Sequence, residues 1–291
     1  MSRVLQPFEY LEPVTIDEAV DMLSRYGPGA SVMAGGVGLV EAMRDRGNGP
    51  QWVISLQGIP ALDFIKGDRL AGLRIGALTS IRSVELSSVI ERDYPVLHEA
   101  AHQIASVQVK NMGTLVGNLC CGTPASDLAP PLLVLGAELK TTGPGSPRTI
   151  PLDDFFKDAG RTALGPDEIV AEISVPPIIG ETRGAFLKLA RVSADIAKVN
   201  AAITIEMAGH TCLEARIALG SVAPTPIRAL KAEAILMEKT LTTDVILEAA
   251  RAAAEEAHPI DDIRSTAGYR REMAMLLVKR VIQKALKGAV T

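Results

Sequence analysis

The chain has 291 residues, of which 47% are hydrophobic and 22% charged, and its net charge is −4; this composition is typical of a globular protein, and the length favours two domains. Its lysines and arginines are scattered, which argues against a nucleic-acid partner, because a surface that binds phosphates needs a basic stripe. The sequence has no apolar run of the roughly 18 residues that span a bilayer and no signal-peptide core in Met1–Pro13, so it predicts a cytoplasmic protein without a membrane span.

Residues 8–56 are expected to form a unit in which strands and helices alternate. Thr15-Ile16-Asp17-Glu18 is a capping box, and it predicts a helix that ends before Gly27-Pro28-Gly29. The other expected elements are a strand at Ser31–Met33, a helix at Leu39–Arg46 and a strand at Trp52–Leu56.

Ala34-Gly35-Gly36-Val37-Gly38 connects a predicted strand to a predicted helix. In this position backbone N–H groups and a helix N-terminus can hold a pyrophosphate. The glycine spacing differs from the dinucleotide-binding pattern G-x-G-x-x-G, and a simple glycine turn is the alternative interpretation.

A second unit is expected to end at Pro176-Pro177, the best candidate for a domain boundary. Its expected elements, in chain order, are a strand at Leu73–Ala77, a helix from Thr79 or Ser80 towards Ile90, a helix from Pro95 through Ala105, a helix near Leu128–Leu135, and strands at Glu138–Thr141 and Ile169–Val175.

His98-Glu99-Ala100-Ala101-His102 lies in the helix expected after Pro95. On a helix, the pattern H-E-x-x-H places two imidazoles where they can hold zinc and a glutamate where it can activate a bound water. A catalytic zinc needs a third protein ligand, and the other histidines, His210 and His258, are expected in the other domain. A zinc hydrolase is therefore one hypothesis, and a helix without a metal explains the pattern as well.

The segment Gly113–Pro130 is rich in glycine, proline and small polar residues. We expect a loop that brings its backbone close to a ligand with phosphates or amides. Asp127 is expected to cap the next helix, a role that is compatible with facing that ligand. The adjacent Cys120 and Cys121 are expected to be small residues without a redox role, because a disulfide between neighbours is strained. Together with Cys212 they are too few for a disulfide framework or an iron–sulfur cluster.

The remainder of the chain is expected to form a sheet covered by helices. Two strands, Ala201–Met207 and Leu213–Leu219, are expected to pair around a turn, and helices are expected at about 226–237, 243–257 and 266–287.

Several short motifs occur in order along nearly the whole chain: Phe8–Pro13, Ala34–Gly36, Asn111–Asn118, Pro124–Asp127, Lys188–Arg191, Asp195–Val199, Ala223–Arg228, Asp261–Arg264 and Tyr269–Arg271. Together they resemble the FAD-binding medium subunit of the molybdenum hydroxylases, the family of carbon monoxide dehydrogenase and bacterial xanthine dehydrogenase. The resemblance implies an α+β fold. An FAD-binding domain of the vanillyl-alcohol oxidase or PCMH type would occupy residues 1–176, with subdomains at about 1–56 and 57–176, and a smaller α+β domain of the carbon monoxide dehydrogenase flavoprotein type would occupy 178–291.

The resemblance also implies which residues contact FAD. The two glycine motifs and two charged residues would do so, namely Ala34, Gly35, Gly36, Val37, Gly38, Thr114, Leu115, Val116, Gly117, Asn118, Asp127 and Lys188. Lys188 would approach the isoalloxazine ring, where a cation stabilises the negative charge of a reduced flavin; from the residues alone it is expected to be a solvated strand residue. No catalytic residue or metal ligand is implied.

At two places the chain differs from the family. A glycine usually stands at the position of Val116, and a hydroxyl or imidazole side chain followed by Asp or Ser usually stands at the positions of Val37 and Gly38. We expect FAD to bind nonetheless and to depend more on main-chain N–H groups.

The implied function is electron transfer within an oxidoreductase complex. Substrate would be oxidised at a molybdenum cofactor on a large partner subunit, and electrons would pass through [2Fe-2S] clusters on a small subunit to FAD and then to an external acceptor, in a dimer of heterotrimers. The substrate pocket would lie on another polypeptide. The alternatives are a stand-alone FAD-dependent oxidoreductase of the same fold, a zinc hydrolase that uses His98, Glu99 and His102, and a non-catalytic flavin-binding or assembly module.

Overall fold

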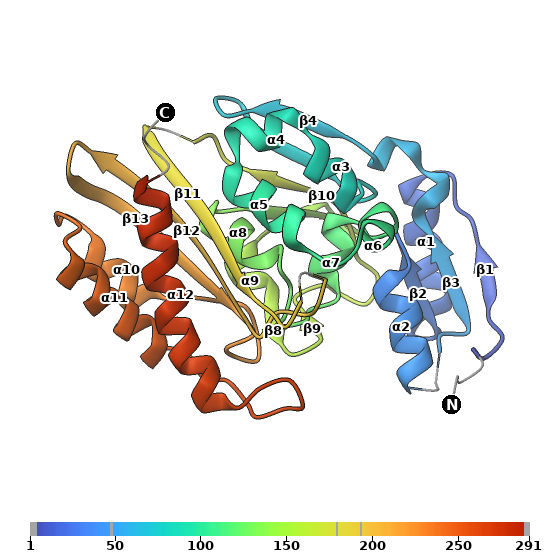
Figure 1. The fold of residues 1–291 in the computed structure, drawn as a ribbon. Helices are drawn as coiled ribbons and strands as arrows, with labels where there is room; N and C mark the ends of the chain where they lie inside the picture. Colours follow the sequence, from blue (N-terminus) through green and yellow to red (C-terminus); the bar gives the residue numbers. More distant parts are fainter. Residues whose placement is uncertain (1–4, 47–48, 179, 193, 288–291) are drawn as a thin grey trace.

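The structure is a computed structural model that describes residues 5–46, 49–178, 180–192 and 194–287. Three larger sheets with their helices follow one another from the N-terminus, blue in Figure 1, to the C-terminus, red. No helix in these ranges is long and apolar enough to cross a membrane.

The N-terminal sheet has three parallel strands in the order β1-β3-β2. Its elements are β1 (Glu9–Leu11), α1 (Ile16–Tyr26), η1 (Gly27–Gly29), β2 (Ala30–Met33), α2 (Val37–Arg46), β3 (Trp52–Ser55), η2 (Leu56–Gly58) and η3 (Pro60–Leu62). Thr15 caps α1 by accepting a hydrogen bond from the backbone N–H of Glu18, as the capping box predicts. The carboxylate of Glu18 accepts from the N–H of Val14 at 2.8 Å, one residue before the expected partner.

The central sheet has five strands in the order β4-β5-β10-β6-β7, with antiparallel pairing between neighbours. Its strands are β4 (Ile65–Asp68), β5 (Gly72–Gly76), β6 (Glu138–Thr142), β7 (Arg148–Pro151) and β10 (Ile169–Val175). Its helices are α3 (Ile81–Leu86), α4 (Ser88–Asp93), α5 (Pro95–Gln103), α6 (Val107–Met112), α7 (Leu115–Cys120) and α8 (Ala129–Val134), and α9 (Leu152–Phe155) leads into a hairpin of β8 (Phe156–Asp158) and β9 (Arg161–Thr162).

Two predictions for this region are wrong. The helix expected from Ser80 towards Ile90 is two helices, because Ser87 leaves the helical conformation and its side chain caps α4. The segment Gly113–Pro130 is not a loop throughout, since it contains α7. Apolar side chains of this segment also anchor it in the core, namely Leu115, Val116, Leu119 and Leu128.

The C-terminal sheet has four antiparallel strands in the order β11-β12-β13-β14, followed by three helices. Its elements are β11 (Glu181–Leu189), β12 (Val199–Ala208), β13 (Thr211–Gly220), β14 (Ile227–Arg228), α10 (Leu230–Leu236), α11 (Thr243–Glu255) and α12 (Ala267–Lys287). The predicted pairing of the two long strands is confirmed. The helix expected from residue 226 begins only at Leu230, because Ile227 and Arg228 pair with β13.

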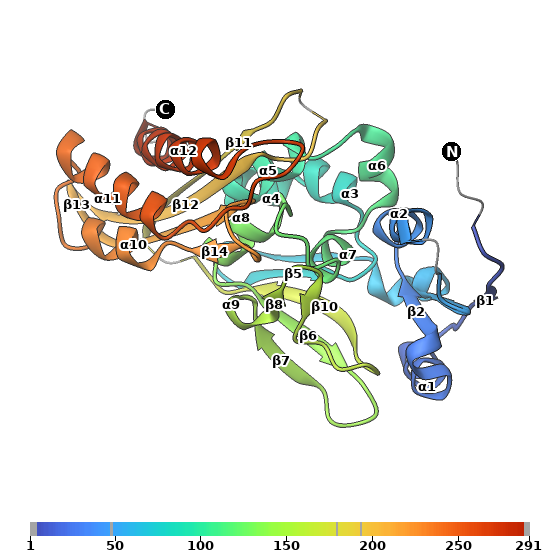
Figure 2. The same ribbon diagram turned by 90° about the horizontal axis from the view of Figure 1, so that it is seen from below.

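The helices and sheets are stacked in layers, as Figure 2 shows. α5 and α8 pack on one face of the C-terminal sheet, while α10 and α12 cover the other face. Successive residues of β12 therefore point into two different hydrophobic cores. Ala202 packs in the core formed mostly by residues 19–175, whereas Ala201 and Ile203 pack in the core between the C-terminal sheet and its helices. Because this sheet is buried on both faces, it holds the C-terminal part firmly against α5 and α8, which precede and follow the second glycine motif along the chain.

Candidate functional site

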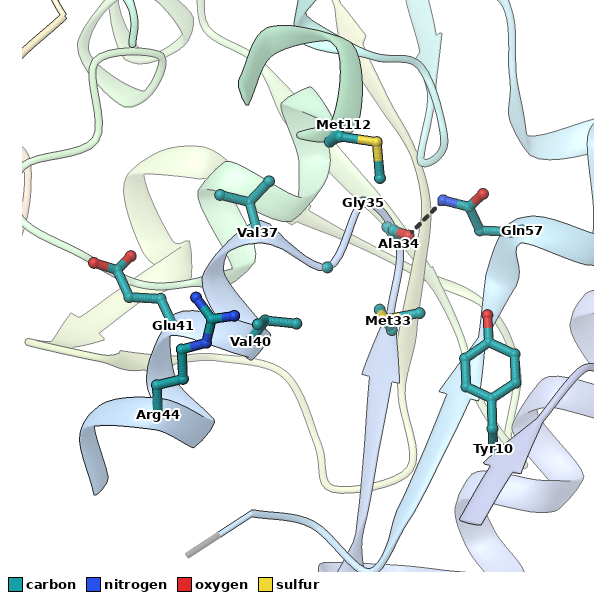
Figure 3. Close-up of a pocket in the computed structure, with 11 residues that line it drawn as sticks. Tyr10, Met33, Ala34, Gly35, Val37, Val40, Glu41, Arg44, Gln57 and Met112 are labelled. Carbon is teal, nitrogen blue, oxygen red and sulfur yellow. Dashed lines mark hydrogen bonds between the residues drawn. The ribbon is translucent and has the colours of Figure 1, made fainter. Parts of the chain in front are cut away.

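A cavity with a volume of about 700 Å³ lies at the carboxyl edge of the parallel sheet β1-β3-β2 (Figure 3). Its walls are formed by Tyr10, Met33, Ala34, Gly35, Gly36, Val37, Val40, Glu41, Arg44, Gln57 and Met112. Ligands of open parallel sheets usually bind at this edge, where strands end and helices begin. The cavity is therefore the natural place to look for a cofactor.

The first glycine motif forms one wall of this cavity as it passes from β2 into α2. Gly36 has a φ of +75°, which residues with a side chain rarely adopt. Gln57 donates a hydrogen bond from Nε2 to the carbonyl oxygen of Ala34 at 3.0 Å, as Figure 3 shows. The first N–H groups of α2 have no intrahelical partner, so they remain available to an anion at this turn.

The two glycine motifs touch through their backbones. A Cβ atom on Gly35 would overlap the carbonyl oxygen of Met112, and a Cβ atom on Gly117 would lie 4.0 Å from the Cβ of Ala34. In Figure 3, Met112 lies directly beside the turn that contains Gly35. The structure thus brings the segment 34–38 against the start of the segment 114–118, as a shared ligand site requires.

The second glycine motif uses several of its own hydrogen-bonding groups internally. The Thr114 hydroxyl accepts from the N–H of Gly117 at 3.0 Å, and the N–H of Leu115 donates to the carbonyl of Thr79 at 3.2 Å. The N–H of Val116 has no intrahelical partner. Because the Val116 side chain packs in the core and is 3% exposed, a valine in place of a glycine puts no bulky group on the solvent side of this turn.

Gly38 leaves room for Cys121. A Cβ atom on Gly38 would lie 2.5 Å from the Cys121 sulfur, so that thiol fills the space that a side chain at position 38 would need. Cys120 and Cys121 are both free thiols. Burial raises the pKa of Cys120 to about 12 and also raises the pKa of Cys121, which keeps both thiols protonated and poorly nucleophilic at neutral pH.

The contact between Gly38 and Cys121 predicts that the effect of Gly38→Ala depends on the residue at position 121. In the wild-type chain the new methyl group must displace the sulfur of Cys121, an exposed side chain that can turn away, so the cost of this displacement should roughly cancel the gain from a better helix former. In a Cys121→Ala background the same change should stabilise the chain by up to about 1 kcal/mol, since alanine favours a helix more than glycine does. Urea unfolding of the four variants measures this cycle, and equal effects of Gly38→Ala in both backgrounds would contradict it.

Lys188 is buried and paired. Its ammonium group lies 2.7 Å from Asp127 Oδ2 and donates to the carbonyl of Gln103 at 3.2 Å, and its side chain is 3% exposed. The other oxygen of Asp127 accepts from Asn200 Nδ2 at 2.8 Å. Burial raises the pKa of Asp127, while the Lys188 charge and the Asn200 hydrogen bond oppose this rise. The expectation from the residues alone that Lys188 is solvated is wrong.

At the start of α8 the side chain of Ser126, and not that of Asp127, accepts a backbone hydrogen bond, although Leu128 occupies the N-cap position. The Ser126 hydroxyl oxygen accepts from the N–H of Ala129 at 3.1 Å, whereas the Asp127 carboxylate is engaged by Lys188 and Asn200. Ser126 Oγ also lies 2.6 Å from Asn118 Oδ1, which connects the pair Asp127–Lys188 to the second glycine motif. Sequence reasoning missed Ser126 and Asn200. Ser126 could have been found, because a serine shortly before a predicted helix is a common acceptor for the first N–H groups, but Asn200 is 73 positions from Asp127 and has no local signal.

Glu99, the glutamate of the H-E-x-x-H pattern, joins two parts of the fold. One carboxylate oxygen accepts from the buried N–H of Phe186 at 2.7 Å, and the other lies 2.7 Å from Lys284 Nζ. His102 Nδ1 lies 3.0 Å from a carboxylate oxygen of Glu85. Among the described residues, no three His, Cys, Asp or Glu side chains are grouped so that they could hold a metal ion. The geometry therefore gives no support to a zinc hydrolase.

Replacing Glu99 by alanine should destabilise the chain by about 1–3 kcal/mol, because it leaves the buried N–H of Phe186 on an edge strand without an acceptor. His98→Ala on the same helix is the matched control and should change stability little. Thermal unfolding of both variants checks the prediction, which fails if Glu99→Ala is no less stable than His98→Ala.

Comparisons with known proteins show the family to which the chain is related. The family described as "FAD binding domain in molybdopterin dehydrogenase" matches residues 6–178, and the one described as "CO dehydrogenase flavoprotein C-terminal domain" matches residues 184–285. The carbon monoxide dehydrogenase medium chain of Hydrogenophaga pseudoflava is 34% identical over 278 residues, which cover 96% of each chain. That of Afipia carboxidovorans is 32% identical over 279 residues, again 96% of each chain.

The fold shows the same relationship. A solved structure of carbon monoxide dehydrogenase from Hydrogenophaga pseudoflava, in a form that lacks the Mo-pyranopterin moiety of the molybdenum cofactor, contains a chain that is 35% identical and superposes with a TM-score of 0.95. The match covers 98% of this chain and 99% of that chain. The chain described here therefore belongs to the FAD-binding medium subunits of the molybdenum hydroxylase family, and it carries their FAD-binding domain.

Proposed function

We propose that this chain is the electron-transfer subunit of a molybdenum hydroxylase complex. FAD on this chain would receive electrons from [2Fe-2S] clusters on a small subunit and deliver them to an external acceptor, while a large subunit oxidises the substrate at a molybdenum cofactor. The expected assembly is a dimer of such heterotrimers. The observation that carries the proposal is the backbone contact between the two glycine motifs beside a cavity of about 700 Å³.

The residues around this contact fit a dinucleotide cofactor. Main-chain N–H groups at Gly36, Val37, Gly38 and Val116 would hold its diphosphate, in agreement with the expected loss of hydroxyl side chains at positions 37 and 38. Arg44 on α2 also lines the cavity and forms no ion pair within the described part of the chain, so it is free to attract phosphate oxygens. Bound FAD supplies the electron-carrying chemistry, and the protein supplies position and electrostatics.

The remaining expected contacts divide into two groups. The first group contributes to the shape of the turns and not to hydrogen bonds with FAD. The carbonyl of Ala34 and the N–H groups of Leu115 and Gly117 already have hydrogen-bond partners in the protein. Asp127 and Lys188 would act as a buried pair with balanced charge. We further propose that Pro176-Pro177 separates the FAD-binding domain, residues 1–176, from the C-terminal domain, residues 178–291.

The decisive experiment is co-purification of the chain with the products of neighbouring genes, followed by cofactor analysis. We expect flavin at about one equivalent per copy of this chain, with molybdenum and iron confined to the partner chains. Flavin that is reduced by substrate only when the partner chains are present would support the electron-transfer role. A complex without flavin, or an isolated chain that turns over substrate by itself, would refute it.

A further inference from the structure

Ser126 is a buried hydroxyl group with two neighbours. The residue is 1% exposed, and its Oγ atom accepts from the N–H of Ala129 at 3.1 Å. The same oxygen lies 2.6 Å from the side-chain oxygen of Asn118 on α7. Ser126 therefore joins the start of α8 to the second glycine motif.

These contacts determine which way the Asn118 amide is turned. Because the N–H of Ala129 can only donate, the single hydroxyl hydrogen of Ser126 is free for Asn118, whose facing atom must then be the acceptor Oδ1. If the amide were flipped, the buried hydroxyl hydrogen of Ser126 would have no partner, which is costly.

The orientation leaves the amide nitrogen of Asn118 as a donor without an acceptor. Nδ2 has no hydrogen-bond partner among the residues that the structure describes, and Asn118 is only half-buried. Asn118 directly follows Gly117, whose backbone lies against Ala34 on the wall of the cavity. Two N–H groups are thus presented on the helix that meets the first glycine motif.

The segment that carries Ser126 is itself held by the C-terminal sheet. The N–H of Ser221 donates to the carbonyl of Pro124 at 2.7 Å, and Asn200 Nδ2 donates to the carbonyl of Ser126 at 3.3 Å as well as to Asp127. Ser221 and Asn200 are both buried. The hydroxyl group of Ser126 is consequently fixed in place before any ligand binds.

We propose that Ser126 is a positioning residue for the cofactor: by holding Oδ1 of Asn118, it presents the Asn118 Nδ2 group as a donor to an acceptor oxygen of FAD. This inference rests on the proposed function, because it assigns a role toward the same cofactor. Ser126 acts only through Asn118 and need not touch FAD itself.

The test is FAD affinity in the full complex with its partner subunits, after the flavin has been removed and FAD is titrated back. Ser126→Ala and Asn118→Ala should each raise the Kd for FAD about tenfold, the effect of one lost hydrogen bond. The double variant should bind FAD no more weakly than Asn118→Ala alone, because Ser126 has no effect once its partner is absent. A purely structural Ser126 would instead lower the unfolding temperature without changing the Kd.

Ser87→Ala is the matched control, since Ser87 caps α4 through the N–H of Ile90 and forms no hydrogen bond with the glycine motifs in the part of the chain that the structure describes. It should lower thermal stability and leave the Kd for FAD unchanged. The inference is refuted if Ser126→Ala or Asn118→Ala binds FAD like the wild type, or if the losses of the two single variants multiply in the double variant. If Ser126→Ala does not fold, Ser126→Cys takes its place, because a thiol fills the same site but is only a weak hydrogen-bond donor to Asn118; a wild-type Kd for that variant refutes the inference. A wild-type complex without flavin would refute the proposed function instead.

Discussion

Gly35→Ala is expected to abolish FAD binding by the chain. The new methyl group would occupy the position of the Met112 carbonyl oxygen. The methyl group is fixed directly to Cα and the carbonyl belongs to the backbone, so no side-chain rotation can make room. The two glycine motifs must then separate, which removes the shared site that we assign to the diphosphate. Overpacking of this kind also costs about 1–3 kcal/mol of folding free energy, or more where the backbone itself must shift.

The measurement is flavin content per copy of the chain, together with thermal unfolding of the purified complex. Gly145→Ala is the matched control, because a Cβ atom there meets no other atom within 4 Å. It should keep full flavin content. A Gly35→Ala variant that retains wild-type flavin would show that close approach of the two motifs is not needed for binding.

Lys188→Met is expected to destabilise the chain by about 3–5 kcal/mol, the usual cost of removing one partner from a buried ion pair. The change leaves the Asp127 carboxylate buried beside Asn200 without its counter-charge. Adding Asp127→Asn should recover much of this loss, since the double variant buries no unpaired charge. The free energy of unfolding in urea measures all three variants.

The destabilisation by Lys188→Met should depend on pH. Burial already raises the pKa of Asp127, and loss of the lysine charge raises it further. Between the unfolded carboxyl pKa of about 3.9 and the raised pKa of the folded variant, Asp127 is protonated in the folded state and ionised in the unfolded chain. Stability therefore falls as the pH rises through the folded pKa, and the deficit of Lys188→Met should be smaller at acidic pH than at neutral pH.

Lys140→Met provides the control for this pair. Lys140 lies 2.7 Å from Glu172, but its side chain is 45% exposed, so the same substitution should cost only about 0–1 kcal/mol. The combined variant Lys188→Met with Asp127→Asn should lose the added pH dependence. Equal costs for Lys188→Met and Lys140→Met would contradict the assignment of Lys188 to a buried, charge-balanced pair.

Much of the secondary structure could be predicted because its signals are local. The capping box at Thr15 placed the start of α1, and alternating apolar residues placed β12 and β13. The segment that contains α7 was misjudged, since its glycines and prolines outweighed the helical spacing of Leu115 and Leu119. Of β11 only a strand conformation at Lys188 was expected, because the extent of this strand depends on pairing with β12 and on the carboxylate of Glu99.

The candidate site also contains features that the local sequence predicts and features that depend on tertiary contacts. The glycine motifs identify the cofactor class, because close backbone approach to phosphates needs glycine wherever it occurs. Nothing local predicts the role of Asn200, which reaches Asp127 only when β12 packs near α8. A zinc site was one interpretation of the H-E-x-x-H pattern. In the folded chain, Glu99 instead contacts Phe186 and Lys284, and these contacts explain the glutamate without a metal.

The sequence by itself determined the family, the α+β class and the two glycine motifs, because these depend on the order of residues along the chain. Only the tertiary structure decided that Gly35 meets Met112, that Cys121 fills the space beside Gly38 and that Lys188 is neutralised by Asp127. Each of these contacts joins residues that are distant in sequence, and their energies arise from desolvation and from close packing. Neither effect exists until the chain has folded.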